Sequence, residues 1–528
     1  MANQLWKSGT SRDQSSLLPA RVEDYVESDN PVRALDDHVD RLDLKGLGFR
    51  HGDRSIGVGQ PPYDPGDLLK LYIYGYLNRV RSSRRLEREA RRNLEVIWLL
   101  KGLRPGYRTI AAFRAENRAA LKRANIELIR RACGLGLVGG TLVAIDGAFF
   151  HGDASKGSIK TKKKLADQIA AIERDLEAYG SALEANDAAE AERGTRGGDG
   201  DGGSGDTGQK IAALMAERTR AQADLDRLEE SGETQVSRTD PDARLLTKSG
   251  QTVAGYNVQI AVDDKHKLIV ASEVVNDGND TGQLHPIASA AKEALGVDKL
   301  QVVADVGYYN GVALKACEDD AIVAYVPQAE RTGRLQAQGR VTHASFVYDA
   351  PADAYRCPAG ALLLPTLGRK KSPAGRVDIR YTSRKADCDA CPLRGRCVTD
   401  KTPTRTIQRW EHEDVLVRHR ARMNGADDLM RRRSGLVEHP FGTLKCRAGY
   451  RHFLVRGFDK VRGEWALMAL CYNLARMFTI LGVRGFIARL VACVPLGVRS
   501  LAAALSILTT DYAKIAPNPT MLPRTSLR

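Results

Sequence analysis

Apolar residues in the first 135 positions recur at the three- and four-residue spacing of helices, between short polar turns. Asn30-Pro31 and Asp64-Pro65 each set a capping side chain directly before a proline, the pairing that typically begins a helix. We therefore expect a helical N-terminal domain over residues 15–135.

From residue 140 onward, short apolar runs rich in strand-forming residues replace this pattern. The runs are TLVAIDGAFF, AGYNVQIAVDD, KLIVASEVV, LQVVADVGYYN and AIVAYVP. Helical segments separate the last three, so the order is three strands, helix, strand, helix, strand. This order predicts an α/β fold with a ribonuclease-H-like mixed sheet in residues 140–480, followed by C-terminal helices and a tail in 481–528.

Two segments interrupt the expected sheet. Residues 160–240 are charged, with apolar residues at helical spacing on both sides of a tract rich in Gly and Asp at 194–208. We interpret this insertion as an antiparallel helical hairpin closed by a flexible linker. Residues 328–405 carry a cluster of cysteines, and we expect them to form a small lobe of their own.

The charge balance of the chain favours a polyanionic partner. It has 80 Lys+Arg against 65 Asp+Glu, a formal net charge of +15, and each phosphate that a basic protein neutralises releases counterions. A basic protein without such a partner is the alternative. The start is polar, without the apolar stretch of a secretory signal. Charged residues interrupt the apolar stretch at 485–510, so we expect a cytoplasmic protein without a membrane span.

A strongly basic helix is expected within the N-terminal domain. The run SSRRLEREARR includes Arg84, Arg85 and Arg88 and lies among short helices with tight turns. Such helices with one arginine-dense member are typical of helix-turn-helix DNA readers, so these three arginines are candidate DNA-binding residues. The alternative is a solvated face on an ordinary helical bundle.

Two acidic residues are expected at the ends of separate strands. Asp146 and Asp305 each end an apolar run and precede small residues. Adjacent strands would bring the carboxylates within reach of shared cations, and Mg²⁺ prefers such hard oxygen ligands. Two cations can activate the attacking oxygen and stabilise the leaving oxygen in phosphodiester cleavage. A third carboxylate, Glu438, lies in a basic stretch. On residue type alone, an ion-pair partner and a metal ligand are equally good interpretations of this Glu.

Together these motifs resemble the DDE transposases of bacterial insertion sequences. The matching runs are AIDGAFF around Asp146, VVADVGYYNG around Asp305 and VEHPFGTLK around Glu438. The resemblance covers roughly residues 15–480. It is closest to the branch with a helical N-terminal domain and a cysteine cluster before the catalytic Glu.

The same family usually has a basic residue seven positions after the Glu, and a Tyr and an Arg before it. Lys445 fits the first of these positions. The two upstream positions hold Arg431 and Ser434, with Arg433 beside the second. The resemblance implies that Lys445 and Arg433 hold phosphate as charge-assisted donors. This departure from the family pattern at the two upstream positions affects the implied phosphate contacts more than the implied role of Glu438.

The resemblance implies a transposase that binds the terminal inverted repeats of its element, cleaves DNA and transfers the 3′-hydroxyl ends to target DNA. Asp146, Asp305 and Glu438 would be catalytic and would bind Mg²⁺ or Mn²⁺. The implied partner is double-stranded DNA, both element ends and target, held by at least a homodimer at the bacterial nucleoid. A catalytically inactive DNA-binding descendant, and another ribonuclease-H-like nuclease such as a resolvase, are the competing functions.

The cysteines of residues 328–405 form a second candidate site. They are Cys357, Cys388, Cys391 and Cys397. Four thiolates in one short segment, two of them in a CxxC pair, suit a tetrahedral Zn²⁺ site. Four protein ligands would leave no open position, so the role of the zinc would be structural. An iron–sulfur site and unbound thiols are the alternatives.

Overall fold

The computed structural model describes residues 21–53, 61–192, 204–248, 250–329, 333–371, 376–399 and 401–492. They fall into two compact units. The first takes in residues up to 120, 134–137 and those from 473 onward, and the second takes in 121–133 and 138–472. Helices α6 (Arg118–Gly134) and α16 (Phe458–Leu481) contribute residues to both units.

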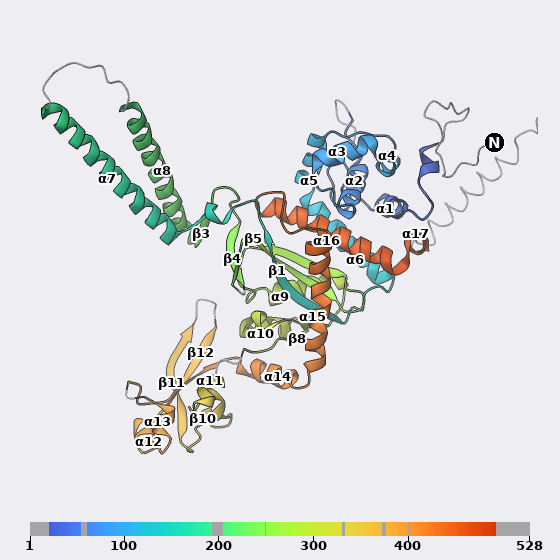
Figure 1. Ribbon diagram of the computed structural model, residues 1–528. Helices are drawn as coiled ribbons and strands as arrows, with labels where there is room; N and C mark the ends of the chain where they lie inside the picture. Colours follow the sequence, from blue (N-terminus) through green and yellow to red (C-terminus); the bar gives the residue numbers. More distant parts are fainter. Residues whose placement is uncertain are drawn as a thin grey trace, which may run out of the picture. The chain divides into compact units, whose positions relative to one another are not determined.

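The first unit is helical, as expected (Figure 1). Both predicted helix starts are present: the Asn30 side chain accepts the N–H of Val32, and the Asp64 side chain accepts that of Gly66. Its elements are η1 (Val22–Tyr25), α1 (Pro31–Asp40), α2 (Pro65–Leu77), α3 (Ser83–Arg92), α4 (Leu94–Leu99), α5 (Tyr107–Glu116) and α17 (Val483–Ala492).

Helix α2 forms the centre of this unit. It is buried on nearly all sides, and Leu69, Tyr72 and Ile73 are fully covered. A helix that is apolar all round is stable only when other elements enclose it. The buried ammonium of Lys70 is paired with Asp36 and Asp40 of α1, each at 2.5 Å, so its charge is compensated.

The second unit contains a six-stranded mixed sheet in the order β4-β5-β1-β7-β8, with β6 also paired to β5. Strand β1 pairs antiparallel with β5 and parallel with β7, and β7 pairs parallel with β8. The predicted mixed α/β class is therefore confirmed. The strands are β1 (Leu142–His151), β4 (Arg244–Lys248), β5 (Gln251–Asp263), β6 (Ile269–Val275), β7 (Leu300–Val303) and β8 (Ile322–Tyr325). The helices between and after them are α9 (Leu284–Leu295), α10 (Gly311–Asp319), α14 (Glu413–Met423) and α15 (Asp427–Gly442).

Strand β1 runs further than its sequence suggests. The prediction that it ends at Asp146 is wrong, because Asp146 pairs with Ile260 and the strand continues to His151. Its long antiparallel partner β5 keeps hydrogen-bonding to this end. The parallel pairing with β7 stops at Ala144, so Asp146 lies just past the end of the β1–β7 pair.

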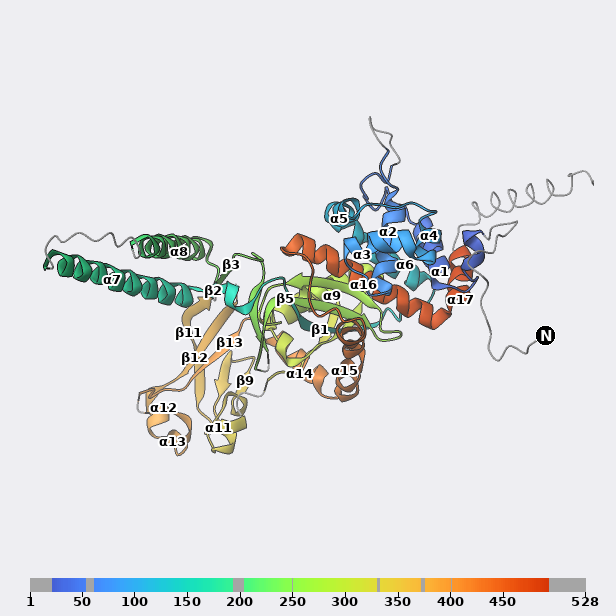
Figure 2. The ribbon, with the colours of Figure 1, turned by 45° about the horizontal axis from the view of Figure 1, so that its top comes forward.

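Two long helices, α7 (Lys162–Glu192) and α8 (Ser204–Ser231), lie side by side as an antiparallel hairpin (Figures 1 and 2). A short two-stranded sheet, β2 (Ile159–Thr161) with β3 (Gln235–Ser237), closes its base. The expected linker at 194–208 is too long at its C-terminal end, because α8 already begins at Ser204. Residues 194–203 of the expected linker lie outside the described residues.

A separate five-stranded antiparallel sheet has the order β13-β12-β11-β10-β9. Aromatic rings fill its core, with Tyr355 and Tyr381 at 5.2 Å between ring centroids. Trp410 is buried at the end of β13, and α14 begins shortly afterwards at Glu413. The elements here are α11 (Gly333–Ala337), η4 (His343–Ser345), β9 (Val347–Asp349), β10 (Ala354–Arg356), β11 (Leu362–Lys371), β12 (Val377–Ser383), α12 (Lys385–Asp389), α13 (Arg394–Cys397) and β13 (Thr406–Trp410). Two further 3₁₀ turns lie elsewhere in the second unit: η2 (Lys156–Ser158) and η3 (Val306–Tyr308).

Helix α15 passes through Pro440 and then widens into the π-helical turn η5 (Thr443–Arg447). A proline removes one helical donor, and a π turn is a common local adjustment of the backbone. At the C-terminal end α17 covers 483–492, and the rest of the helices and tail expected in 481–528 lies outside the described residues. Within the described ranges no single helix is long and apolar enough to cross a membrane, although α16 and α17 pass that test as a pair bent by 99°.

Candidate active site

Asp146 is a largely buried carboxylate on β1, with 21% of its side chain exposed. Its Oδ1 accepts the N–H of Gly147 at 2.8 Å. Burial raises the pKa of Asp146 above its ordinary value, and the negative charge of Asp305 raises it further. A carboxylate in this setting favours a cation beside it.

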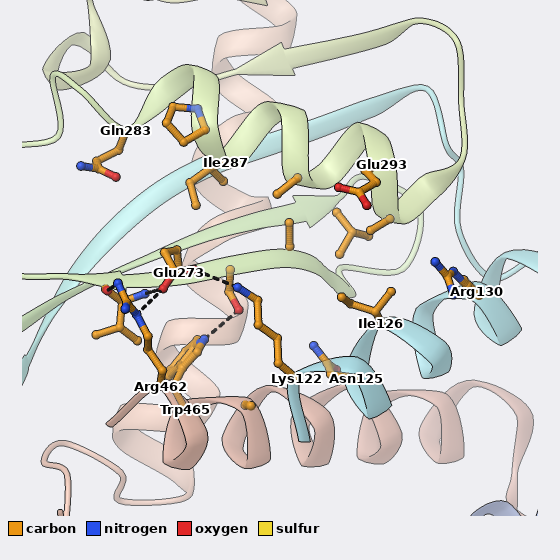
Figure 3. Close-up of a pocket in the computed structure, with 18 residues that line it drawn as sticks. Lys122, Asn125, Ile126, Arg130, Glu273, Gln283, Ile287, Glu293, Arg462 and Trp465 are labelled. Atoms are coloured by element: carbon orange, nitrogen blue, oxygen red, sulfur yellow. Dashed lines mark hydrogen bonds and ion pairs between the residues drawn. The ribbon is translucent and has the colours of Figure 1, made fainter. Parts of the chain in front are cut away.

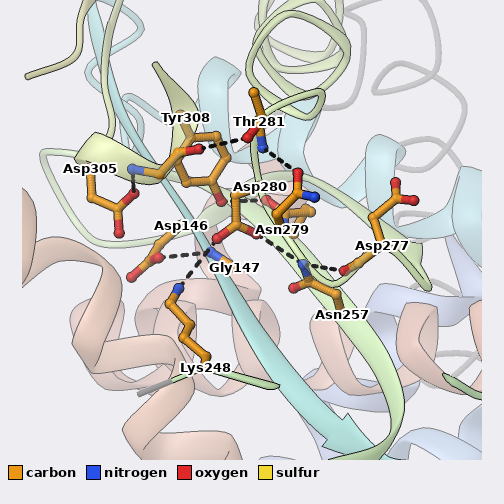
Figure 4. Close-up of polar contacts among 12 residues, drawn as sticks. Asp146, Gly147, Lys248, Asn257, Asp277, Asn279, Asp280, Thr281, Asp305 and Tyr308 are labelled. Carbon is orange, nitrogen blue, oxygen red and sulfur yellow. Dashed lines mark hydrogen bonds and ion pairs between the residues drawn. The ribbon is translucent and has the colours of Figure 1, made fainter. Parts of the chain in front are cut away.

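Asp305 approaches Asp146 from the neighbouring strand. It follows β7 by two residues and caps the turn η3, where its Oδ1 accepts the N–H of Gly307 at 2.9 Å. The pairing of the parallel strands β1 and β7 ends at Ala144 and Val303, and Asp146 and Asp305 each follow two residues later, so their carboxylates lie close together (Figure 4). The structure thus brings together the two acids that the strand pattern singled out.

Glu438 lies on α15, a helix that packs against β1, β5 and β7. Its side chain is exposed, and its Oε1 accepts a hydrogen bond from the Ser434 hydroxyl at 2.6 Å. Among the described residues no group of three or more His, Cys, Asp or Glu is arranged to hold a metal ion. The helix therefore brings Glu438 to the same region of the unit as the two aspartates without assembling a three-carboxylate ligand set.

Two basic residues expected to hold phosphate have protein partners. Arg433 is 19% exposed, and its Nη1 lies 3.7 Å from Asp146 Oδ2. This nitrogen donates no hydrogen bond to any described residue. Lys445 donates to the Phe149 carbonyl at 2.7 Å and lies 4.5 Å from the centre of the Phe150 ring. Burial lowers the pKa of Lys445 to about 8, although Asp146 opposes this shift.

A buried polar cluster behind the two aspartates was not foreseen. Asp280 lies in the loop after β6, and its Oδ1 accepts hydrogen bonds from Asn257 and Gln259 of β5 at 2.9 and 2.7 Å. The Tyr308 hydroxyl donates to Gln259, and Lys248 pairs with Asp280. One feature of the sequence could have pointed to Asp280. The run NDGND places an acid next to a glycine-containing turn directly after an apolar strand.

The pair Asp146 and Asp305 suits a divalent cation in its chemistry. Both supply hard carboxylate oxygens, which Mg²⁺ and Mn²⁺ prefer. Burial first, and then the charge of Asp305, raise the pKa of Asp146, so a cation beside this carboxylate would be favourable. The residues present therefore fit a divalent metal held by Asp146 and Asp305. A third protein ligand would have to move towards this pair to complete the site.

Two segments of the chain match models of known protein families. Residues 356–478 match the family model of the transposase DDE domain, and residues 20–116 match that of a transposase domain, DUF772. Two segments of the chain are thus similar to transposase domains. The resemblance to insertion-sequence transposases is thereby confirmed. The DDE match includes Glu438 and Lys445, whereas Asp146 and Asp305 precede it.

Two further comparisons add little to the transposase assignment. A search of curated proteins found no match. Among solved structures, the cryo-EM structure of a piggyBac transposase synaptic complex with hairpin DNA aligns with 94% of this chain and 87% of that chain. The alignment has 10% sequence identity and a TM-score of 0.29.

The four cysteines predicted as a metal site lie around one cavity of about 170 Å³ in the lobe of the second sheet. Cys388 Sγ lies 3.0 Å from the Ser383 hydroxyl, and Cys391 Sγ accepts the N–H of Leu393 at 3.4 Å. Burial raises the pKa of Cys397, and the other three thiols add to this effect. The sulfurs converge on one space, but the described residues contain no group arranged as a metal ligand set.

The arginines proposed from the sequence lie on α3 of the helical unit. Arg84, Arg85 and Arg88 are exposed, and Arg84 lies 5.2 Å from the centre of the Tyr107 ring. Arg91 and Arg92 of the same helix are instead ion-paired with Glu87 and Glu89, at 3.0 and 2.6 Å. Helix α3 thus carries three exposed arginines and two further arginines that are ion-paired with glutamates of the same helix.

A separate cavity of about 280 Å³ opens between α6, β6, α9 and α16 in the second unit (Figure 3). Its walls include Ile126, Ile287 and Trp465, and Glu273 at its edge pairs with Lys122 and Arg462 at 2.9 and 2.7 Å. None of the acidic residues of the candidate site lines it, so it is distinct from the Asp146–Asp305 pair.

Proposed function

We propose that this chain is the transposase of a bacterial insertion sequence, which cleaves DNA and transfers 3′-hydroxyl ends by metal-dependent phosphoryl transfer. The observation that carries the proposal is that Asp146 and Asp305 lie close together just past the end of the β1–β7 pairing, in a chain whose later segment, with Glu438, matches a DDE domain. Glu438 is proposed as the third catalytic carboxylate.

The strand arrangement supports a ribonuclease-H-like core. Strands β6, β5 and β1 are antiparallel neighbours, and β7 and β8 run parallel to β1, with α9 before β7 and α10 before β8. Apart from β4, which also pairs antiparallel with β5 and which no apolar run predicted, this is the order expected from the sequence. In such a core the first acid lies on the first strand and the second follows the fourth, which corresponds to Asp146 and Asp305 here.

Each residue would have a distinct task. Asp146, Asp305 and Glu438 would hold divalent metal, which when bound activates the attacking oxygen and stabilises the leaving one. Arg433, 3.7 Å from Asp146, would orient that carboxylate and face the scissile phosphate. Lys445 would steady the β1 backbone through its bond to the Phe149 carbonyl and would reach phosphate only by leaving that contact.

A cleavage assay tests this function. The full chain is incubated with Mg²⁺ and duplexes carrying the inverted repeats that flank its gene, or scrambled repeats. A transposase is expected to cut at the repeat ends and to join their 3′-hydroxyls to a target plasmid. Binding without cutting would favour the inactive DNA-binding descendant, and nicking without end preference would favour a general nuclease. Synapsis predicts that two ends are held by at least a dimer.

Replacing Arg85 and Arg88 with alanine should weaken binding to the element ends. Each arginine that contacts a phosphate contributes about one unit to the slope of log affinity against log salt, so the slope should fall by about two. Gel shifts at several salt concentrations measure it. The matched control is alanine at Arg91 and Arg92, which are already paired within α3. Equal losses in both double variants would contradict a specific role for the exposed pair.

We also propose that the four cysteines bind structural Zn²⁺ after a small convergence of their thiolates. Metal analysis of the purified chain should then find about one zinc ion per chain. Cys388→Ser should lose this zinc and lower the melting temperature. The control Cys446→Ser, at an exposed cysteine in η5, should retain it. Wild-type chain that is free of zinc after purification without chelators would refute the proposal.

A further inference from the structure

Lys248 brings a positive charge to the two catalytic aspartates from a third strand. It ends β4, at the turn leading into β5, and its Nζ lies 3.2 Å from Asp280 Oδ2 (Figure 4). Burial alone would lower the pKa of Lys248, but the carboxylates of Asp280, Asp146 and Asp305 outweigh it and raise the pKa. The side chain is 48% exposed, so the ammonium also has a path towards solvent.

Asp280 is the fixed partner of this lysine. Its side chain is only 7% exposed, and one of its oxygens is held by two amide donors, from Asn257 and Gln259. A Cβ placed on Gly147 would lie 2.8 Å from Asp280 Oδ1, and one on Gly307 would lie 3.7 Å from Oδ2. Asp280 therefore lies beside the backbone that follows Asp146 and the backbone that follows Asp305.

Acceptors outnumber donors in this cluster. The carboxylates of Asp280, Asp146 and Asp305 all act on the ammonium of Lys248, while Arg433 of α15 and the partly buried Lys445 add positive charge near Asp146. The fully buried Asn257 also leaves its Oδ1 without a hydrogen-bond partner among the described residues. A cluster of carboxylates with unused acceptors attracts cations. Lys248 is one cation that the chain itself supplies.

We propose that Lys248, anchored by Asp280, is a built-in cation of the active site that competes with divalent metal for Asp146 and Asp305. The inference rests on the proposed function, because it assumes that these two aspartates bind metal. In the metal-free protein Lys248 lowers the repulsion between the carboxylates. When metal binds, the ammonium is repelled, and its exposed side can turn to a DNA phosphate.

The test is a calorimetric titration of the full chain with Mn²⁺ in the absence of DNA. Removing a nearby positive charge strengthens the attraction of a cation for the carboxylates, so Lys248→Met should bind Mn²⁺ about three- to tenfold more tightly. Its cleavage of end DNA should nevertheless fall, because a phosphate contact is lost. Lys248→Arg should stay close to wild type in Mn²⁺ affinity. The surface control Lys315→Met, whose partner is Asp319 on the same helix, should change neither property.

Failure of this inference differs from failure of the proposed metal site. Unchanged or weaker Mn²⁺ affinity in Lys248→Met, with wild-type melting behaviour, would overturn the role of Lys248. Asp146→Asn serves as the second arm, because it removes a proposed metal ligand. If wild type and Asp146→Asn bound Mn²⁺ alike, the metal site itself would be misplaced, whatever the result for Lys248.

Discussion

Asp146→Asn should abolish DNA strand cleavage while leaving binding to the element ends unchanged. The substitution keeps the size of the side chain and its hydrogen bond from Gly147, but it removes the charge that would hold metal. Changes to residues that merely support a metal ligand cost about 10- to 100-fold in activity. Loss of a ligand should therefore exceed about 100-fold. Cleavage rates under saturating Mg²⁺, with gel shifts on the same DNA, measure both properties.

The matched control for this variant is Asp153→Asn. Asp153 lies in the same region of the chain, but it pairs with Arg456 at the surface, where both side chains are about half exposed. Such pairs contribute little, so this variant should cleave like wild type. Asp146→Asn protein that cut element ends at a rate close to wild type would remove Asp146 from the catalytic set.

Gly147→Ala should both destabilise the fold and inactivate the site. A Cβ at this position would lie 2.3 Å from Gln259 Nε2 and 2.8 Å from Asp280 Oδ1. Both side chains are buried and hydrogen-bonded to each other, so neither can yield freely. Overpacking of this kind costs about 1–3 kcal/mol. A shift of about 1 Å in the neighbouring Asp146 would cost about 100-fold in rate.

Urea unfolding and the cleavage assay measure the two effects of Gly147→Ala. Gly435→Ala is the control, because a Cβ on this α15 glycine meets nothing within 4 Å. Alanine in an open helical position should stabilise the protein by up to about 1 kcal/mol. A Gly147→Ala protein as stable and as active as wild type would show that the cluster around Asp280 is not tightly packed.

The features that the sequence predicted are those set by local chemistry. The caps at Asn30 and Asp64 need only neighbouring residues, and the apolar runs carry the order of the strands. Asp305 was correctly placed at a strand end because β7 is short and buried, and a turn follows at once.

The remaining features depend on partners distant in sequence. Asp146 lies within β1 rather than at its end because β5, more than a hundred positions later, extends the pairing. Lys445 is occupied by the Phe149 carbonyl, a partner 296 positions away, which no local pattern reveals. Lys248 and Asp280 resemble ordinary turn residues until the folded sheet brings them together.

The most direct test of the central claim is iron-mediated cleavage of the polypeptide itself. Fe²⁺ replaces Mg²⁺ in oxygen-ligand sites, and with ascorbate and peroxide it cuts the backbone near its ligands. If Asp146, Asp305 and Glu438 form one metal site, the full chain bound to end DNA should be cut close to all three residues, and excess Mg²⁺ should suppress every cut. Cuts near the two aspartates but none near Glu438, or cuts that Mg²⁺ does not suppress, would contradict the three-carboxylate site.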